Sequence, residues 1–151
     1  MDDLLRAWNA NDAVTRALLD LCPDEALELK PGKGKTIRSN FVHIIGVRRA
    51  HAETRFRREV GTLPKLDWQS AGREEIRTAL ETSRDLVGAL LQSLHDKPTR
   101  WSPALFLAYA VAHEAHHRSQ IEIALRLGGY DPGDAATYAL WDWPKLARGL
   151  E

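Results

Sequence analysis

The sequence predicts an all-α fold, a four-helix bundle followed by a short C-terminal helix. Apolar residues recur three and four positions apart through four long stretches, with proline or glycine between them. No stretch alternates apolar and polar residues as a strand would, and we find no internal repeat. A chain of 151 residues is long enough for a sizeable core, so we expect one domain over residues 1–151.

The first helix is predicted over residues 2–21, and Pro23 ends it. Asn11 is the polar residue on its apolar face, and a position at the edge of that face would explain it as well as a functional role. A short helical turn is predicted over residues 24–29. The apolar face of the first helix consists of Leu4, Trp8, Val14, Leu18 and Leu21.

A loop rich in glycine and lysine follows over residues 31–36. Its Gly34-Lys35-Thr36 sequence is similar to the end of a phosphate-binding loop. That motif requires glycine where Leu29 stands, and a strand before it. We therefore interpret the loop as a flexible connector, with Thr36 as the N-cap of the next helix.

The second helix is predicted over residues 37–60 and closed by Gly61. His43 lies on one flank of its apolar face. The second half carries five arginines, but Glu53 and Glu59 interrupt them, so we expect a solvated surface rather than an anion site. These arginines are Arg48, Arg49, Arg55, Arg57 and Arg58.

The third helix is predicted over residues 70–94, after a linker over residues 61–69. Fully extended, that linker would reach roughly 30 Å, about the length of a helix, so the second and third helices need not be antiparallel. Ser83 is the one polar residue of the third helix's apolar seam. Its hydroxyl could bond back to its own helix or line a polar cavity.

The fourth helix has the clearest start in the sequence. Ser102 is its expected N-cap and Pro103 its first residue, while Trp101 is placed to pack against Phe106. The helix should end at Gly128-Gly129. The short loop before it predicts that the third and fourth helices are antiparallel neighbours.

A last short helix is predicted over residues 134–142. Its aromatic residues would then cap one end of the bundle. They are Tyr138, Trp141 and, just beyond, Trp143.

Two histidines of the fourth helix predict a metal site. His113 and His117 are one turn apart, roughly 40° apart around the helix, so both imidazoles can reach one ion. His43 can supply a third nitrogen if the second and fourth helices face each other. A buried polar group without a partner costs about 1–3 kcal/mol, so converging histidines should be hydrated, hydrogen-bonded or metal-bound. Three protein nitrogens leave coordination positions for water or substrate.

A zinc-protease interpretation must be weighed, because His113 to His117 satisfies the HExxH pattern. A metzincin would need Gly at 120 and His at 123, where this chain has Gln120 and Ile123. Neither Glu122 nor the terminal Glu151 resembles the downstream ligand of other such proteases. Glu114 is then most simply a surface residue that pairs with Arg118.

Composition excludes several classes of function. Lys plus Arg and Asp plus Glu number 21 each, so nothing in the net charge attracts nucleic acid. No apolar run approaches a membrane span, and the acidic N-terminus is no signal peptide. Cys22 is the one cysteine and cannot form an internal disulfide, so we expect a cytoplasmic protein.

Several motifs, taken in order, resemble the DinB/YfiT superfamily. They are a tryptophan near the N-terminus, Pro23-Asp24-Glu25, Asn40-Phe41-Val42-His43-Ile44-Ile45-Gly46, His113-x-x-x-His117-Arg118-x-Gln120-Ile121, Leu-Gly-Gly-Tyr-Asp and Leu-Trp-Asp-Trp. Together they cover nearly the whole chain. Ser119 departs from the glycine that is frequent in the family, which affects packing more than metal binding.

The resemblance implies a bundle whose second and third helices run parallel, and a divalent metal on His43, His113 and His117. Imidazole suits zinc, nickel, copper and iron; the candidates for this site are zinc, nickel, iron and manganese. Members are often homodimers. Characterised relatives transfer or isomerise with low-molecular-weight thiols such as mycothiol or bacillithiol, and many have no known activity.

Three functional hypotheses follow. The first is a metal-dependent enzyme, either a thiol S-transferase or isomerase or a hydrolase of a small molecule, in which the metal lowers the pKa of a bound thiol or water. Tyr109 and Gln120 would orient the substrate, and His116 would transfer a proton. The second is a non-catalytic metal-binding stress or interaction module. The third is a plain bundle without metal.

Overall fold

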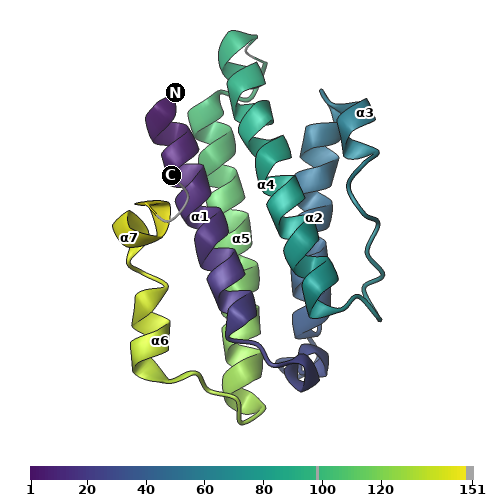
Figure 1. Ribbon diagram of the computed structural model, residues 1–151, viewed down its shortest axis with the longest axis vertical. Coiled ribbons are helices and arrows are strands. Elements are labelled where there is room, and N and C mark those ends of the chain that lie inside the picture. The colour runs from purple at the N-terminus through teal and green to yellow at the C-terminus, as the bar shows by residue number, and fades with distance from the viewer. Residues whose placement is uncertain (98, 149–151) are drawn as a thin grey trace.

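Four long helices form a bundle in the computed structural model, which describes residues 1–97 and 99–148 (Figure 1). Within these residues no strand is present, so the predicted all-α fold is confirmed. The predicted domain also included residues 149–151, which lie outside the described residues. In chain order the elements are α1 (Asp2–Asp20), η1 (Asp24–Glu28), α2 (Ile37–Glu53), α3 (Arg57–Val60), α4 (Arg73–Asp96), α5 (Pro103–Leu127), α6 (Gly133–Ala139) and α7 (Trp143–Arg148).

Helices α2 and α4 run parallel. The connection between α3 and α4 returns along the length of α2 before α4 begins, as Figure 1 shows. α1 and α5 run in the opposite direction, and α7 packs on α1. This is the order of helices that the resemblance implied, and it places α2 next to α5.

Local sequence signals fix the helix starts. The Thr36 hydroxyl accepts from the Ser39 backbone N–H at 3.0 Å, and the Ser102 hydroxyl accepts from the Leu105 N–H at 3.2 Å. Both predicted N-caps are therefore confirmed. α4 begins later than predicted because Gly72 is its N-cap.

Two apolar clusters make up the core. The larger includes Phe41, Ile44, Leu80 and Ile121, all 0% exposed, and joins all four long helices. The smaller surrounds Trp8 near the other end of the bundle. The predicted packing of Trp101 on Phe106 is present there, with ring centroids 6.1 Å apart.

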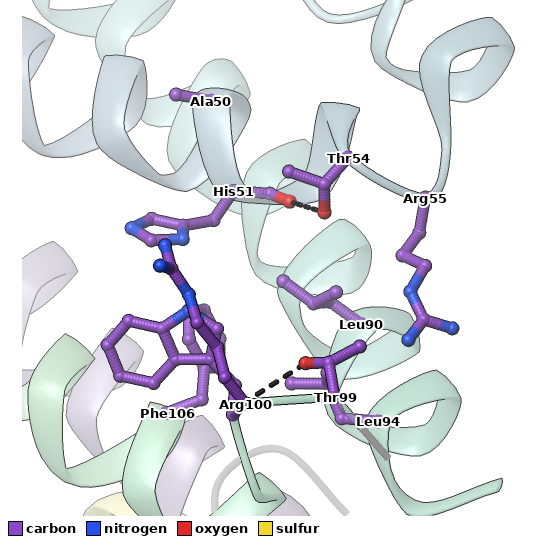
Figure 2. A pocket seen from close by; sticks show the side chains of 10 residues that line it. Ala50, His51, Thr54, Arg55, Leu90, Leu94, Thr99, Arg100 and Phe106 are labelled. Carbon is purple, nitrogen blue, oxygen red and sulfur yellow. Dashed lines mark hydrogen bonds between the residues drawn. The ribbon is translucent and has the colours of Figure 1, made fainter. Parts of the chain in front are cut away.

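The predicted second helix, residues 37–60, is broken near its end. Phe56 leaves the helical region with φ −127° and ψ 49°, and its ring packs against the smaller core cluster. The Thr54 hydroxyl donates to the His51 carbonyl oxygen at 2.7 Å where α2 ends (Figure 2). Burial of the Phe56 ring thus interrupts the helix at a point where the neighbouring residues, 51–60, include neither proline nor glycine.

The predicted helix over residues 134–142 corresponds to α6, which ends at Ala139, and a further helix that was not predicted, α7, begins at Trp143. Tyr138 and Trp141 are 74% and 75% exposed, so neither caps the bundle as predicted. Only Trp143 packs against the larger core cluster. Among the described residues, no helix combines the length and the apolar character needed to cross a membrane.

Two glycines inside long helices give a test of this packing. A Cβ at Gly46 would meet nothing within 4 Å, and one at Gly88 would meet only Leu5 Cδ2 at 3.9 Å. Each change to alanine should raise the free energy of unfolding by about 0.5–1 kcal/mol, because alanine loses less backbone entropy on folding. Urea unfolding followed by circular dichroism measures this. Gly129→Ala, at φ +81°, should lower stability instead, and destabilisation by Gly88→Ala would contradict the packing described here.

Candidate metal centre

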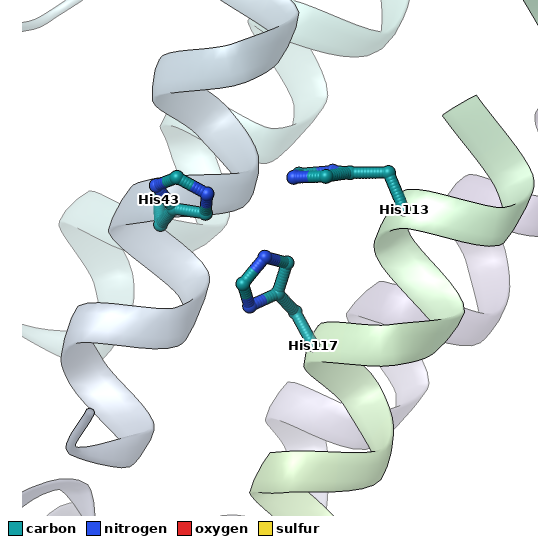
Figure 3. A group of neighbouring side chains, drawn as sticks. All are labelled: His43, His113 and His117. Atoms are coloured by element: carbon teal, nitrogen blue, oxygen red, sulfur yellow. The ribbon is translucent and has the colours of Figure 1, made fainter. Parts of the chain in front are cut away.

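Three imidazoles meet between α2 and α5. His43 projects from α2, and His113 and His117 project from successive turns of α5 (Figure 3). Each offers one ring nitrogen, and the three nitrogens lie within 4.8 Å of one another. The ring centroids of His43 lie 5.4 Å from His113 and 4.5 Å from His117. The predicted convergence is confirmed.

The cluster fits a divalent transition metal. Zinc–nitrogen bonds of about 2.0–2.1 Å place tetrahedral ligand atoms about 3.3 Å apart, so small ring movements would close this site around an ion. His117 is buried, while His43 and His113 are half-buried and border solvent. Among the described residues no Asp, Glu or Cys joins the group. Three histidines could therefore hold the ion and leave coordination positions open.

Asn40 fixes which nitrogen of His117 is available. Its Nδ2 donates to the carbonyl oxygens of Thr36 at 3.0 Å and Lys35 at 3.3 Å, so its Oδ1 is an acceptor. That oxygen lies 2.8 Å from His117 Nδ1, which must then carry the proton and donate it. The lone pair of His117 is left on Nε2. A metal-ligating histidine is usually oriented in this way by a second hydrogen bond.

The surroundings of all three rings favour the neutral imidazole by lowering its pKa. Burial lowers the pKa of His43, and the Lys35 charge lowers it further. Burial and the neighbouring His43 lower the pKa of His113. Burial, His43 and His113 lower the pKa of His117 to about 4. A metal binds the neutral imidazole, so these ligands need lose no proton on binding.

A buried ion pair stands directly behind the histidines. Arg48 Nε donates to Glu114 Oε1 at 2.7 Å, and Nη2 donates to Oε2 at 2.9 Å. Arg48 Nη1 also donates to Asp12 Oδ1 at 2.7 Å. Glu114 was predicted at the surface and Arg48 on a solvated face, and both predictions are wrong. The two residues are only 2% and 4% exposed, because each supplies the charge that the other needs in the interior.

Further polar side chains complete this network. Asn11, which is fully buried rather than at a surface edge, donates to Glu114 Oε2 at 2.8 Å and accepts from Arg118 Nη1 at 3.0 Å. The predicted pair of Glu114 and Arg118 is present at 3.6 Å. The Ser83 hydroxyl bonds back to its own helix, as the first of its predicted alternatives had it: it donates to the Leu80 carbonyl oxygen, and it also accepts from Arg48 Nη1.

The HExxH sequence therefore does not form a protease site. Burial opposes ionisation of Glu114, but the Arg48 guanidinium outweighs it and lowers the pKa of this carboxyl. A carboxylate with two bonds to Arg48 is a poor general base. The third histidine of the cluster also comes from α2 rather than from downstream of α5.

The three residues predicted to act on the substrate differ in their contacts with the histidine cluster. The Tyr109 ring stacks on His113, with centroids 5.9 Å apart, and is 36% exposed. The exposed His116 ring lies 5.1 Å from His117, closer than its helical angle indicated, but is not in the ligand group. Gln120 is half-buried and has no side-chain hydrogen bond among the described residues. Their roles remain predictions.

Sequence reasoning missed Asn40 and His51. Asn40 stood in the motif quoted for the resemblance, but nothing local showed that its amide would meet a histidine 77 residues away. His51 lies two helical turns beyond His43 on α2, and its ring centroid is 5.2 Å from that of Tyr109. The spacing of His43 and His51 along the predicted helix could have indicated that His51 lies near the cluster.

Comparison with protein-family models gives one match. The model described as DinB family matches residues 1–145. Comparisons with curated proteins and with solved structures found no match.

The buried ion pair should dominate stability. Arg48→Met should lower the free energy of unfolding by about 3–5 kcal/mol, because it leaves buried carboxylates without their main partner. Arg77→Met removes an arginine whose partner Asp20 is exposed, and should change stability by less than about 1 kcal/mol. Urea unfolding of both variants under chelator measures the difference. Equal effects would contradict the role given to Arg48.

The Asn40 amide should set the affinity for metal. Asn40→Ala should weaken zinc binding by roughly 10–100-fold, because His117 loses the acceptor that orients its ring. Asn40→Asp loses the same two bonds to carbonyl oxygens but keeps an acceptor, so it should retain affinity. Competition with a chromogenic chelator gives both constants. The idea fails if Asn40→Ala binds zinc as tightly as the wild type.

Proposed function

This chain belongs to the DinB family, and from that premise and its three converging histidines we propose that it is a metal-dependent enzyme acting with a low-molecular-weight thiol. The reaction class is S-transfer or a related isomerisation. The observation that carries the proposal is a three-nitrogen cluster, with no carboxylate among the described residues, that borders solvent.

The chain's own thiol does not serve as the nucleophile. Cys22 is the one cysteine and is fully buried. Burial raises the pKa of its thiol to about 12, so it stays protonated and inaccessible. A thiol-dependent reaction at this centre therefore takes its thiol from solution. The lone buried cysteine also agrees with the cytoplasmic setting that we propose.

The charge around the centre favours an anionic ligand. A bound divalent ion would supply Lewis acidity, lowering the pKa of a coordinated thiol from its usual value of about 8.5. Three neutral imidazoles leave the charge of such an ion uncompensated. Lys35 adds positive potential, which acts on both His43 and His117. Glu114 offers little compensation, because Arg48 already neutralises it.

A cavity beside the cluster has room for the thiol. It measures about 590 Å³ and is lined by His43, Gly46, Lys35 and Trp68, among others. Binding pockets for small molecules commonly have volumes of about 300–1,000 Å³. Lys35 and Lys30 give this cavity a positive rim, so it suits a thiol that bears an acidic group.

The remaining residues take supporting roles in the proposed reaction. Tyr109, stacked on His113 and partly exposed, orients the substrate together with Gln120. In the transfer, the thiolate sulfur forms a bond to an electrophilic carbon while the leaving group departs with its electron pair. His116, exposed beside His117, returns a proton from solvent to that group. A homodimer, implied by the family, stays a prediction that light scattering would test.

The decisive experiment is a screen for thiol-dependent activity. Protein purified without a histidine tag is assayed for its metal, then for consumption of electrophiles in the presence of different thiols. We expect metal-dependent turnover that His113→Ala reduces to background. His95→Ala, which removes an exposed histidine of the last turn of α4 that is not in the ligand group, should leave activity unchanged.

Two results would count against this function. Bound metal without turnover of any thiol would favour a non-catalytic metal-binding module. Wild-type protein that binds no metal would favour a plain bundle.

A further inference from the structure

A second cavity lies at the far end of α2 from the loop that carries Lys35. It measures about 690 Å³ and lies between the ends of α2 and α4 and the start of α5. Leu90, Leu94, Phe106 and Trp101 give it apolar and aromatic walls, and Arg55 and Arg100 give it charge. Figure 2 shows the two arginines on either side of Leu90. We call this cavity the arginine pocket.

Neither arginine of the pocket has an acidic partner within residues 1–97 and 99–148. Among the described residues, no carboxylate oxygen lies within 4.0 Å of Arg55 or Arg100, and no Asp or Glu lines the cavity. Arg55 is nevertheless held in place: Nη1 donates to Ser93 Oγ at 3.0 Å, and Nη2 donates to the Lys97 carbonyl at 2.8 Å. Two unneutralised guanidinium groups at one apolar cavity favour an anion.

An aromatic wall connects the arginine pocket with the histidine cluster. His51 lines the pocket, and its ring centroid lies 5.2 Å from that of Tyr109. Tyr109 in turn stacks on His113 with centroids 5.9 Å apart. On α2, His43 and His51 are eight residues apart, about 12 Å along the helix. A small molecule of that length can touch the pocket at one end and the metal centre at the other.

We propose that the arginine pocket binds the electrophilic substrate, and that this substrate is an aromatic or bulky apolar carboxylic acid. Its carboxylate pairs with Arg100, whose guanidinium makes no other side-chain hydrogen bond among the described residues, and Arg55 adds positive charge to the same cavity. Its apolar body packs against Trp101, Phe106 and the leucines. The electrophilic carbon extends past Tyr109 toward His113. The role as second substrate rests on the proposed function, whereas the binding site for the acid does not.

A pair of probes tests the charge requirement. 2-Naphthoate carries the aromatic body and the carboxylate, and 2-naphthamide is its neutral counterpart. Calorimetric titration of the zinc-loaded wild type should give clearly tighter binding for naphthoate. Equal affinity for the two probes would overturn the proposal.

Matched arginine variants locate the site. Arg100 makes no side-chain hydrogen bond among the described residues, so Arg100→Gln should fold normally, which a urea midpoint checks. It should weaken naphthoate binding about tenfold and leave naphthamide unchanged, since one charge-assisted contact is lost. Arg57→Gln makes the same charge change at an exposed residue outside the pocket and should have no effect. Arg55→Lys, which keeps the charge but not the planar fork, should weaken naphthoate less than Arg100→Gln does.

Two further arms separate this inference from the proposed function. In His113→Ala, naphthoate should still bind, because the acid is held by arginines and not by metal. Loss of binding in that variant would place the carboxylate on the metal and overturn the proposal. So would weaker naphthoate binding in Lys35→Gln together with no change in Arg100→Gln. A protein without thiol-dependent activity would still bind naphthoate if the pocket is assigned correctly.

Discussion

The two-point contact between Arg48 and Glu114 is the constraint on which the rest of the structure depends. A charge in the bundle interior is tolerated only where an opposite charge and further hydrogen bonds meet it. Here Glu114 receives two bonds from Arg48, and Asp12 takes the remaining face of the guanidinium. The pair ties α2 to α5, and Glu114 is the direct neighbour of His113. The distance between the two helices that hold the histidines is thus set by an interaction that tolerates little movement.

The polar groups of this interior fall into two kinds. In the ion-pair network every charge has an opposite charge close by. Among the described residues, the buried side-chain atoms without a hydrogen-bond partner are Arg38 Nε and Arg73 Nε, and both lie outside this network. The histidine cluster differs, because Asn40 satisfies one nitrogen of His117 while the nitrogens directed at the centre are left to one another. The fully hydrogen-bonded ion-pair network makes this part of the bundle rigid. The histidine nitrogens that face the centre of the cluster keep their lone pairs available for a metal ion. The fold places the ion-pair network directly behind the histidine cluster.

The sequence predicted correctly those features that depend on residues close together in the chain. The caps at Thr36 and Ser102 and the spacing of His113 and His117 depend on residues within one or two helical turns, and these predictions hold. The Arg48–Glu114 pair joins residues 66 positions apart, and a single sequence offers no sign that either charge is buried. Asn11 and Ser83, polar residues on apolar helix faces, were the available clues. The break at Phe56 escaped for the same reason, because only tertiary packing of its ring reveals it.

The distribution of charge gives the two cavities the same preference, for anionic molecules. The chain carries 21 basic and 21 acidic residues, so its overall field attracts nothing. Asp12 and Glu114, the acidic residues nearest the interior of the site, are neutralised within the ion-pair network. The cations at the two cavities, Lys35 at one and Arg100 at the other, have no acidic partner among the described residues. A neutral protein thereby presents two separate, locally positive cavities near the histidine cluster, and we infer that both select anionic molecules because the carboxylates of the adjacent interior are already paired.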